Sequence, residues 1–211
     1  MRAWQSFLFE EHFEMVLLFC KQPKEEIMEI LKAITDFARK AHEGQRRKFV
    51  DEPYLNHLVR VSEICKEVTS ELPIIAAALL HDLLEDTEVT SEELSAFLSQ
   101  RFSPEGTRQT LKWVHELTDV YTHADYPKWN RDKRKTKEAE RLGKISATAQ
   151  TIKYADILDN SLDIMKSGSG FAPRYLIEAK MNLEKMNRGN KELYKKAKEA
   201  VSEGLRKVRG R

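Results

Sequence analysis

Glycine and proline are scarce in this chain, with 8 and 6 among 211 residues. Because these residues punctuate turns, their scarcity argues against a protein of short strands and hairpins and favours long helices. Cysteine is scarcer still. The two cysteines, Cys20 and Cys65, form neither a CxxC pair nor a spaced framework. This usage argues against a disulfide scaffold and predicts two reduced thiols in a cytoplasmic protein.

Strong net charge and long apolar runs are also lacking. The formal net charge is +2, which gives no general case for nucleic acid or an anionic membrane as partner. The N-terminal segment is apolar, but Glu10, Glu11 and Glu14 interrupt it before it approaches the ~18 residues of a membrane span, and no small-residue cleavage site follows. We therefore predict a soluble amphipathic helix that packs on the domain or on a partner subunit.

Apolar residues make up 41% of the chain and charged residues 33%, a balance that allows a sizeable core and argues against disorder. Apolar side chains recur at helical spacing in most segments, and no internal repeat is visible. We predict an all-α protein with an N-terminal amphipathic helix at 1–22, a main helical domain at 23–188 and a C-terminal helical tail at 189–211. The expected helices cover 24–43, 54–70, 73–86, 91–98, 105–119, 131–141, 151–164 and, with a weak break near Gly189, 173–208.

The segment LLHDLLEDT at 79–87 follows the apolar run LPIIAAA and places His81, Asp82, Glu85 and Asp86 within six positions. Helical spacing puts all four on one side of a helix that is otherwise apolar. Burying unpaired charge costs several kcal/mol per group, so such a cluster needs something to neutralise it. A metal ion is the most economical explanation.

A second polar stripe lies in TIKYADILDNSLDI at 151–164, where Asp156, Asp159, Asn160 and Asp163 follow i, i+3, i+4, i+7 spacing. Apolar residues border it on both sides, which suits a polar cleft better than a broad solvated face. Either stripe alone is also compatible with helix caps or solvated surface, since exposed acids are common.

The remaining histidines carry less information by themselves. His57 falls in a helical register and would by default belong to the core, and His12, His115 and His123 are interpreted as structural.

Three segments in order, AHEGQRRKFVDEPYLNH, AALLHDLLEDT and IKYADILDN, resemble the hydrolase domain of the RelA/SpoT homologues over about residues 34–165. These are HD-type, metal-dependent phosphohydrolases that act on the alarmones ppGpp and pppGpp. The resemblance implies an HD-domain helical bundle with a metal site between helices, held by His57, His81, Asp82 and Asp156. It also implies Mn²⁺ as the cofactor, although Fe²⁺, Co²⁺ and Zn²⁺ suit the same donors.

The resemblance further implies roles in catalysis and in substrate binding. Glu85 is the leading candidate for activating water, with Asp86 assisting or orienting a ligand histidine. Arg47 and Lys48 match residues that pack against the purine, and Asn160 matches one near the ribose. Lesser pocket candidates are Tyr154, Asp163 and Arg174, whereas Lys133, Arg134 and Lys137 are expected to belong to a solvated helix.

The chain departs from the family pattern in three places, of which one is the connection FVDEP at 49–53, where the family usually has a loop of shorter side chains. Leu58 stands where the family commonly has proline, and no basic residue follows Asp156. The length of the chain indicates a stand-alone small hydrolase without synthetase and regulatory domains.

The predicted function is release of the 3′-pyrophosphate from a guanosine alarmone. The alternatives are the same chemistry on an adenine alarmone or on the 2′-phosphate of NADPH, a nucleotide sensor without turnover, and a helical scaffold. A homodimer and a monomer both fit the sequence.

Overall fold

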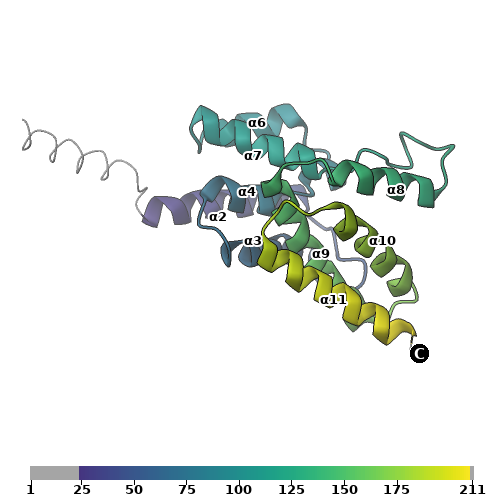
Figure 1. Cartoon of the computed structure of the whole chain (residues 1–211). Coiled ribbons are helices and arrows are strands. Elements are labelled where there is room, and N and C mark those ends of the chain that lie inside the picture. Colours follow the sequence, from purple (N-terminus) through teal and green to yellow (C-terminus); the bar gives the residue numbers. More distant parts are fainter. Residues whose placement is uncertain (1–23, 210–211) are drawn as a thin grey trace, which may run out of the picture. The chain divides into compact units, whose positions relative to one another are not determined.

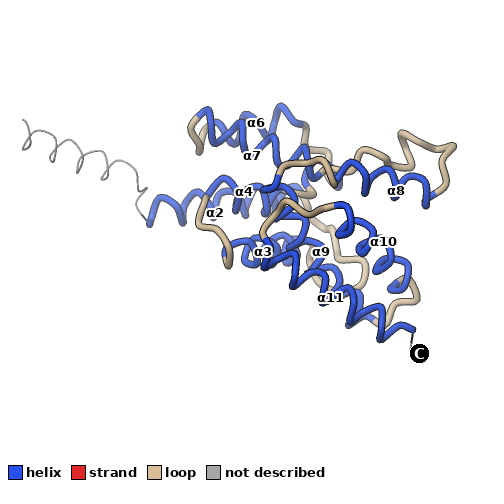
Figure 2. Tube along the Cα trace, viewed as in Figure 1, coloured by secondary structure: helices blue, strands red, loops and turns tan. Residues whose placement is uncertain are grey.

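The computed structural model describes residues 24–209, and within this range all regular structure is helical (Figures 1 and 2). The all-α prediction is confirmed. The chain divides into residues 1–33 and residues 34–211, and the second unit contains every site residue discussed below. The helix expected at 1–22 lies outside the described residues. The helices are α2 (Lys24–Ala41), α3 (Leu55–Lys66), α4 (Leu72–Leu80), α5 (Leu83–Asp86), α6 (Ser91–Ser99), α7 (Pro104–Leu117), α8 (Arg131–Leu142), α9 (Ala147–Ser167), α10 (Ala172–Lys185) and α11 (Lys191–Arg209).

Helix α9 is the centre of the larger unit, because α3, α4, α7, α10 and α11 all pack against it (Figure 1). Ile152, Ala155 and Ile164 on α9 are fully buried. Leu58 and Val61 of α3 are also fully buried. Removing these side chains from water supplies the main driving force for the bundle.

The prediction of a single helix over 73–86 is wrong, because the helix is interrupted between α4 and α5. Helix α4 carries Pro73 in its first turn and ends at Leu80. Asp82 then takes φ −96° and ψ 0°, outside the helical region, and the N–H groups of Glu85 and Asp86 both donate to its carbonyl oxygen. The interruption places His81 and Asp82 between the two helices.

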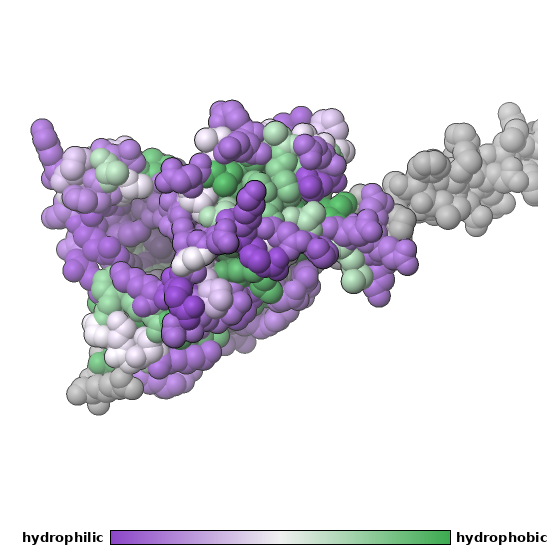
Figure 3. All heavy atoms as spheres, turned by 180° about the vertical axis from the view of Figure 1, so that it is seen from behind, coloured by the Kyte–Doolittle hydropathy of each residue, from purple (hydrophilic) through white to green (hydrophobic). Residues whose placement is uncertain are grey.

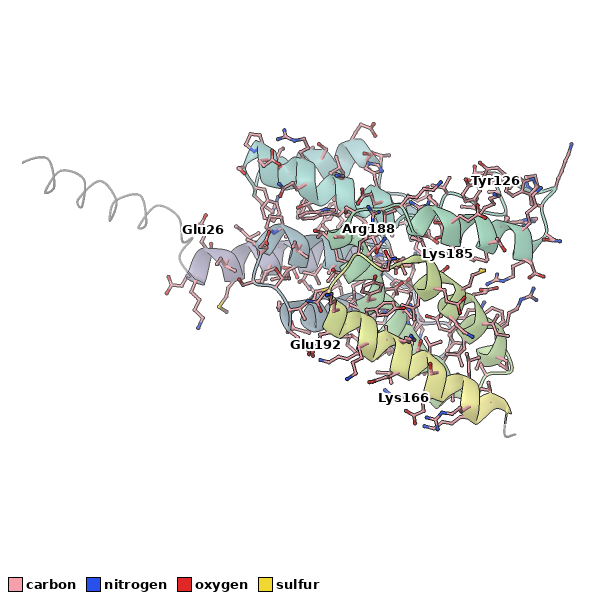
Figure 4. The ribbon with its side chains drawn as sticks, in the orientation of Figure 1. Glu26, Tyr126, Lys166, Lys185, Arg188 and Glu192 are labelled. Carbon is pink, nitrogen blue, oxygen red and sulfur yellow. The ribbon has the colours of Figure 1, made fainter. Side chains whose placement is uncertain are left out.

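Two irregular connections border the site. The first follows Gly44, whose φ of +76° favours glycine, and is closed by the N–H of Arg47 donating to Glu52 O and by the N–H of Tyr54 donating to Gln45 O. The second connects α7 to α8, contains Tyr126 (Figure 4), and confirms the irregular segment expected after residue 120.

Helices α10 and α11 are separated near Gly189, as the sequence predicts. A side chain at Gly189 would place its Cβ 2.6 Å from Cε2 of Tyr154, so only glycine fits this close approach. Leu193, Ala197 and Val201 of α11 are buried, and α11 packs on α9 and α10, so this apolar face is used within the chain. Between Lys24 and Arg209, the structure contains no helix that is long and apolar enough to cross a membrane.

Candidate metal centre and its cavity

Four side chains from three parts of the chain converge on one point. His57 comes from α3, His81 and Asp82 from the break between α4 and α5, and Asp156 from α9. Nε2 of His57 lies 3.6 Å from Oδ2 of Asp82 and 3.3 Å from Oδ1 of Asp156. Nε2 of His81 lies 3.1 Å and 3.7 Å from the same two oxygens. Two imidazole nitrogens and two carboxylate oxygens therefore enclose a common centre.

The inward nitrogens of these histidines are buried polar atoms. His57 is 0% exposed and His81 is 1% exposed. Within residues 24–209, neither Nε2 atom has a hydrogen-bond partner, although buried polar atoms are almost always paired. Ligation accounts for both atoms at once, and a mixed nitrogen and oxygen donor set suits a divalent metal ion. His57, His81 and Asp82 also satisfy the spacing of a metal-binding group by themselves.

The outer nitrogens of the same histidines are held by the protein. Nδ1 of His57 lies 2.7 Å from Oδ2 of Asp159, and Nδ1 of His81 lies 2.9 Å from the carbonyl oxygen of Ala78. Arg60 in turn binds both Asp159 and Asp163. With a proton on each Nδ1, the lone pair of each Nε2 faces the centre, which is the arrangement that metal ligation requires.

Electrostatics at the centre favour positive charge. Burial by itself would lower the pKa values of the histidines, but the surrounding aspartates raise the pKa of His57 to about 9 and that of His81 to about 10. Burial would raise the pKa values of the two aspartates. The imidazoles hold the pKa of Asp82 well below its usual range, and Lys153 and the imidazoles do so for Asp156.

Glu85 and Asp86 extend from α5 beside this centre. Oε2 of Glu85 accepts a hydrogen bond of 2.9 Å from the backbone N–H of Asp119. Burial and the nearby charges of Asp119 and Asp82 raise the pKa of Glu85 to about 7. The hydroxyl oxygen of Tyr54 lies 2.7 Å from Oδ2 of Asp82 and 2.7 Å from Oδ2 of Asp86, so it connects a metal-site carboxylate to its neighbour.

A cavity of about 260 Å³ opens onto these acids. Seen from behind, the surface is hollowed among mainly hydrophilic residues (Figure 3). The cavity carries basic groups on the walls formed by α8 and α9, and its polar lining suits a charged ligand. Its lining residues are Arg47, Tyr54, Asp82, Glu85, Asp86, Asp119, Arg131, Lys135, Glu138, Lys153, Asp156, Ile157, Asn160, Tyr175, Glu178, Ala179 and Asn182.

Of the residues expected to bind substrate, Arg47 and Asn160 line the cavity. The guanidinium of Arg47 donates to Oδ1 of Asn160, and its central carbon lies 5.5 Å from the centre of the Tyr54 ring. Asp163 does not line the cavity. It is buried behind it, where Arg60 donates to it at 2.7 Å and Arg47 lies 3.5 Å away. The stripe predicted on α9 is therefore divided between the cavity and the contact with α3.

Three other expected pocket residues lie elsewhere. Tyr154 is fully buried in the core, with its hydroxyl 3.3 Å from Oε1 of Gln150 and its ring edge against Tyr194. Arg174 is about half exposed and binds Asp132. Lys48 lies over the rings of Phe49 and Phe171 and is not part of the cavity wall.

Several cavity residues were not predicted from the sequence. Lys153 lies one helical turn before Asp156 and forms a 2.9 Å ion pair with its Oδ2, so helical spacing was sufficient to find it. Tyr175, and not Tyr154, lines the cavity together with Tyr54. Helix α8 contributes Arg131, Lys135 and Glu138.

The other basic residues of α8 are used locally. Lys133 lies over the ring of Trp129, Arg134 donates to the carbonyl oxygen of Trp129, and Lys137 pairs with Glu140. This agrees with the interpretation of these three residues as part of a helix surface.

A helical bundle that gathers two histidines and two aspartates around one centre, beside two further carboxylates, is the architecture of a metal-dependent phosphohydrolase. Residues 35–166 match the family model described as HD domain. The chain belongs to the HD domain family and, within it, to the SpoT homologues.

Two relatives and one solved structure show this relationship. Over 146 residues the chain is 34% identical to the Drosophila melanogaster guanosine-3′,5′-bis(diphosphate) 3′-pyrophosphohydrolase MESH1, covering 67% of this chain and 71% of the relative. The Homo sapiens protein of the same name is 33% identical over 142 residues, covering 66% and 71%. The solved structure, described as a metazoan ortholog of SpoT that hydrolyzes ppGpp, matches with a TM-score of 0.69 at 28% identity and covers 88% of this chain and 99% of that one.

Proposed function

We propose that this chain is an enzyme that hydrolyses the 3′-pyrophosphate group of guanosine alarmones. The products from ppGpp and pppGpp are GDP and GTP, each with pyrophosphate. The observation that carries the proposal is the pair of buried Nε2 atoms, unpartnered among residues 24–209, that face two aspartates, with Glu85 and several basic residues in the adjoining cavity. The printed activity of relatives at 33–34% identity supports the choice of substrate.

His57, His81, Asp82 and Asp156 would hold the metal ion, and we propose Mn²⁺. A divalent ion bound there lowers the pKa of a coordinated water and neutralises charge on the reacting phosphate. Asp159 and the carbonyl oxygen of Ala78 keep the two imidazoles in the ligating orientation.

Glu85 is the group that takes the proton from the attacking water. Its carboxylate is held by the N–H of Asp119, and its pKa of about 7 is close to the value that suits a general base near neutral pH. The water oxygen bonds to the phosphorus next to the ribose 3′-oxygen, and the bond between that phosphorus and the 3′-oxygen breaks. The departing 3′-oxygen takes up a proton from solvent to become the hydroxyl, which balances the proton that Glu85 removes from the attacking water. Asp86, bound to Tyr54, fixes the neighbouring carboxylate Asp82.

Two further cavity residues, Arg47 and Asn160, bind the rest of the nucleotide in this proposal. The planar guanidinium of Arg47 suits stacking on a purine, and Asn160, one turn beyond Asp156, is the residue that we assign to the ribose on the basis of the family resemblance. Lys153 places a buried positive charge beside Asp156, where it neutralises phosphate charge.

Product analysis of the purified chain with Mn²⁺ tests this function. The chain is offered ppGpp, ppApp and NADPH in parallel, with Glu85→Gln as the control. Pyrophosphate released from ppGpp by the native chain and lost in the variant supports the proposal. Turnover of ppApp or NADPH alone would keep the site and change the substrate, and metal binding without turnover of any would favour a sensor.

A further inference from the structure

Glu138 on α8 is a buried carboxylate that the proposed reaction does not use. It is 2% exposed and lines the cavity that contains Glu85. A buried charge of this kind is retained only where several hydrogen bonds compensate for the loss of water.

Two of those hydrogen bonds lead directly to the turn that follows α7, and the third leads to it through Arg141. Oε2 of Glu138 accepts from the N–H of Val120 at 3.1 Å and from the N–H of Tyr121 at 3.2 Å. Its Oε1 accepts from Nε of Arg141 at 2.7 Å. Arg141 also donates to the carbonyl oxygens of Glu116, at 2.8 Å, and Thr118, at 3.0 Å.

Asp119 lies at the middle of this turn. Glu138 binds the backbone after Asp119, and Arg141 binds the backbone before it. The backbone N–H of Asp119 is the donor that binds Oε2 of Glu85, and its carboxylate is bound by Lys135, also on α8, at 2.7 Å. Lys135, Glu138 and Arg141 are spaced three residues apart, so they share one face of α8. One face of a charged helix therefore fixes the peptide that orients Glu85.

We propose that Glu138 is a positioning residue for Glu85, acting together with Arg141 through the backbone N–H of Asp119. The proposal rests on the proposed function, in which Glu85 activates the attacking water. Positioning of this kind affects the rate of the chemical step, because a displacement of about 1 Å can cost about 100-fold. Loss of this positioning leaves the metal ligands and the residues proposed to bind the nucleotide, Arg47 and Asn160, unchanged.

The test compares Glu138→Gln with Glu140→Gln, an exposed neighbour on α8 that pairs with Lys137. Kinetics on ppGpp with saturating Mn²⁺, calorimetric Mn²⁺ affinity and hydrogen exchange at the Asp119 amide are measured for both variants. The expected result for Glu138→Gln is a kcat lowered about 10- to 100-fold, with KM and Mn²⁺ affinity within about twofold of the native values. The expected result for Glu140→Gln is native behaviour. Arg141→Lys breaks the same pair from the other side and serves as a second variant if Glu138→Gln folds poorly.

A double variant separates positioning from a general structural effect. In a Glu85→Gln background, adding Glu138→Gln should lower kcat by less than about twofold, because the group that it positions is already lost. The proposal would be overturned if Glu138→Gln lowered kcat by the same factor in the Glu85→Gln background as in the native chain. It would also be overturned if kcat were unchanged in the single variant. If the native chain does not turn over ppGpp, the proposed function fails, and hydrogen exchange then decides the inference independently. Faster exchange of the Asp119 amide in Glu138→Gln supports it, and unchanged exchange refutes it.

Discussion

Oδ2 of Asp159 lies 2.7 Å from Nδ1 of His57, and this contact directs the Nε2 atom of His57 toward Asp82 and Asp156. Asp159 is one turn before Asp163, and Arg60 holds both carboxylates. The orientation of one metal-site histidine is thus set by an aspartate that does not reach the metal centre.

Replacing Asp159 with alanine should weaken metal binding without removing a ligand. Carboxylates that hold ligating histidines typically contribute about 10- to 100-fold in metal affinity, and we expect a loss of that size. Calorimetric titration with Mn²⁺ measures it. Asp132→Ala, at an exposed position, is the matched control, and native affinity in Asp159→Ala would show that the contact has no orienting role.

Metal binding should release protons from the histidines. Since the pKa values of His57 and His81 are raised to about 9 and about 10 in the absence of metal, both imidazoles carry a proton at neutral pH and must lose it to ligate. Apparent affinity should therefore rise by up to about 100-fold per pH unit below pH 9. Titration in buffers of different ionisation enthalpy counts the protons, and a count of zero contradicts the prediction.

The same pKa shifts predict how the stability of the metal-free protein depends on pH. Because both histidine pKa values are raised above their ordinary 6.5, the stabilisation that they provide is fully present below about pH 6.5 and is lost as the pH rises through 9 to 10. Tm measured with chelator should decline over this interval. With saturating Mn²⁺ the decline should be smaller, because metal bound to the folded state stabilises it.

Activity should fall on the acidic side through the titration of Glu85. The group acts as a base only when ionised, and its pKa of about 7 places the loss of activity near neutral pH and below. Glu85→Gln should lose about 100- to 10,000-fold in kcat while retaining the metal ion. A rate profile of native enzyme between pH 5 and 9 checks the titration, and a variant with native kcat would remove Glu85 from the mechanism.

Lys153 offers a different separation of effects. Burial by itself would lower its pKa, but Asp156 and neighbouring carboxylates hold the pKa well above its usual range, so it is a permanent cation. In Lys153→Met we expect kcat/KM on ppGpp to fall by about 10-fold or more, since charge that stabilises the phosphate is lost. Metal affinity should be unchanged or higher, because a cation that competes for Asp156 is removed. Weaker metal binding would contradict this assignment. Lys137→Met, at an exposed ion pair on α8, is the control.

Helix α9 shows where helical spacing is sufficient and where it is not. Lys153, Asp156, Ile157 and Asn160 follow i, i+3, i+4, i+7 spacing and all line the cavity. Tyr154 is rotated by about 100° from Lys153, which turns it into the core. Asp159 and Asp163 are rotated toward α3, where Arg60 meets them. Helical spacing from Asp156 therefore indicates Lys153 as a cavity residue, although it was not predicted. The binding of Asp159 and Asp163 by Arg60, in contrast, depends on how α3 packs.

The sequence by itself determined the helical class and most of the helices, because helical periodicity is a local property of the chain, and the residues expected at the metal centre came from the resemblance of three short motifs to a known family. Only the tertiary structure decided the break at Asp82, the holding of His57 by Asp159 and the contribution of α8 to the cavity. The last two of these depend on which helices pack together, because the side chains that meet there are distant in sequence. Glu138 is the clearest case. In the sequence its charge is typical of a solvated helix, whereas in the structure it binds the N–H groups of Val120 and Tyr121, 18 and 17 residues earlier, and so belongs to the cavity that contains Glu85.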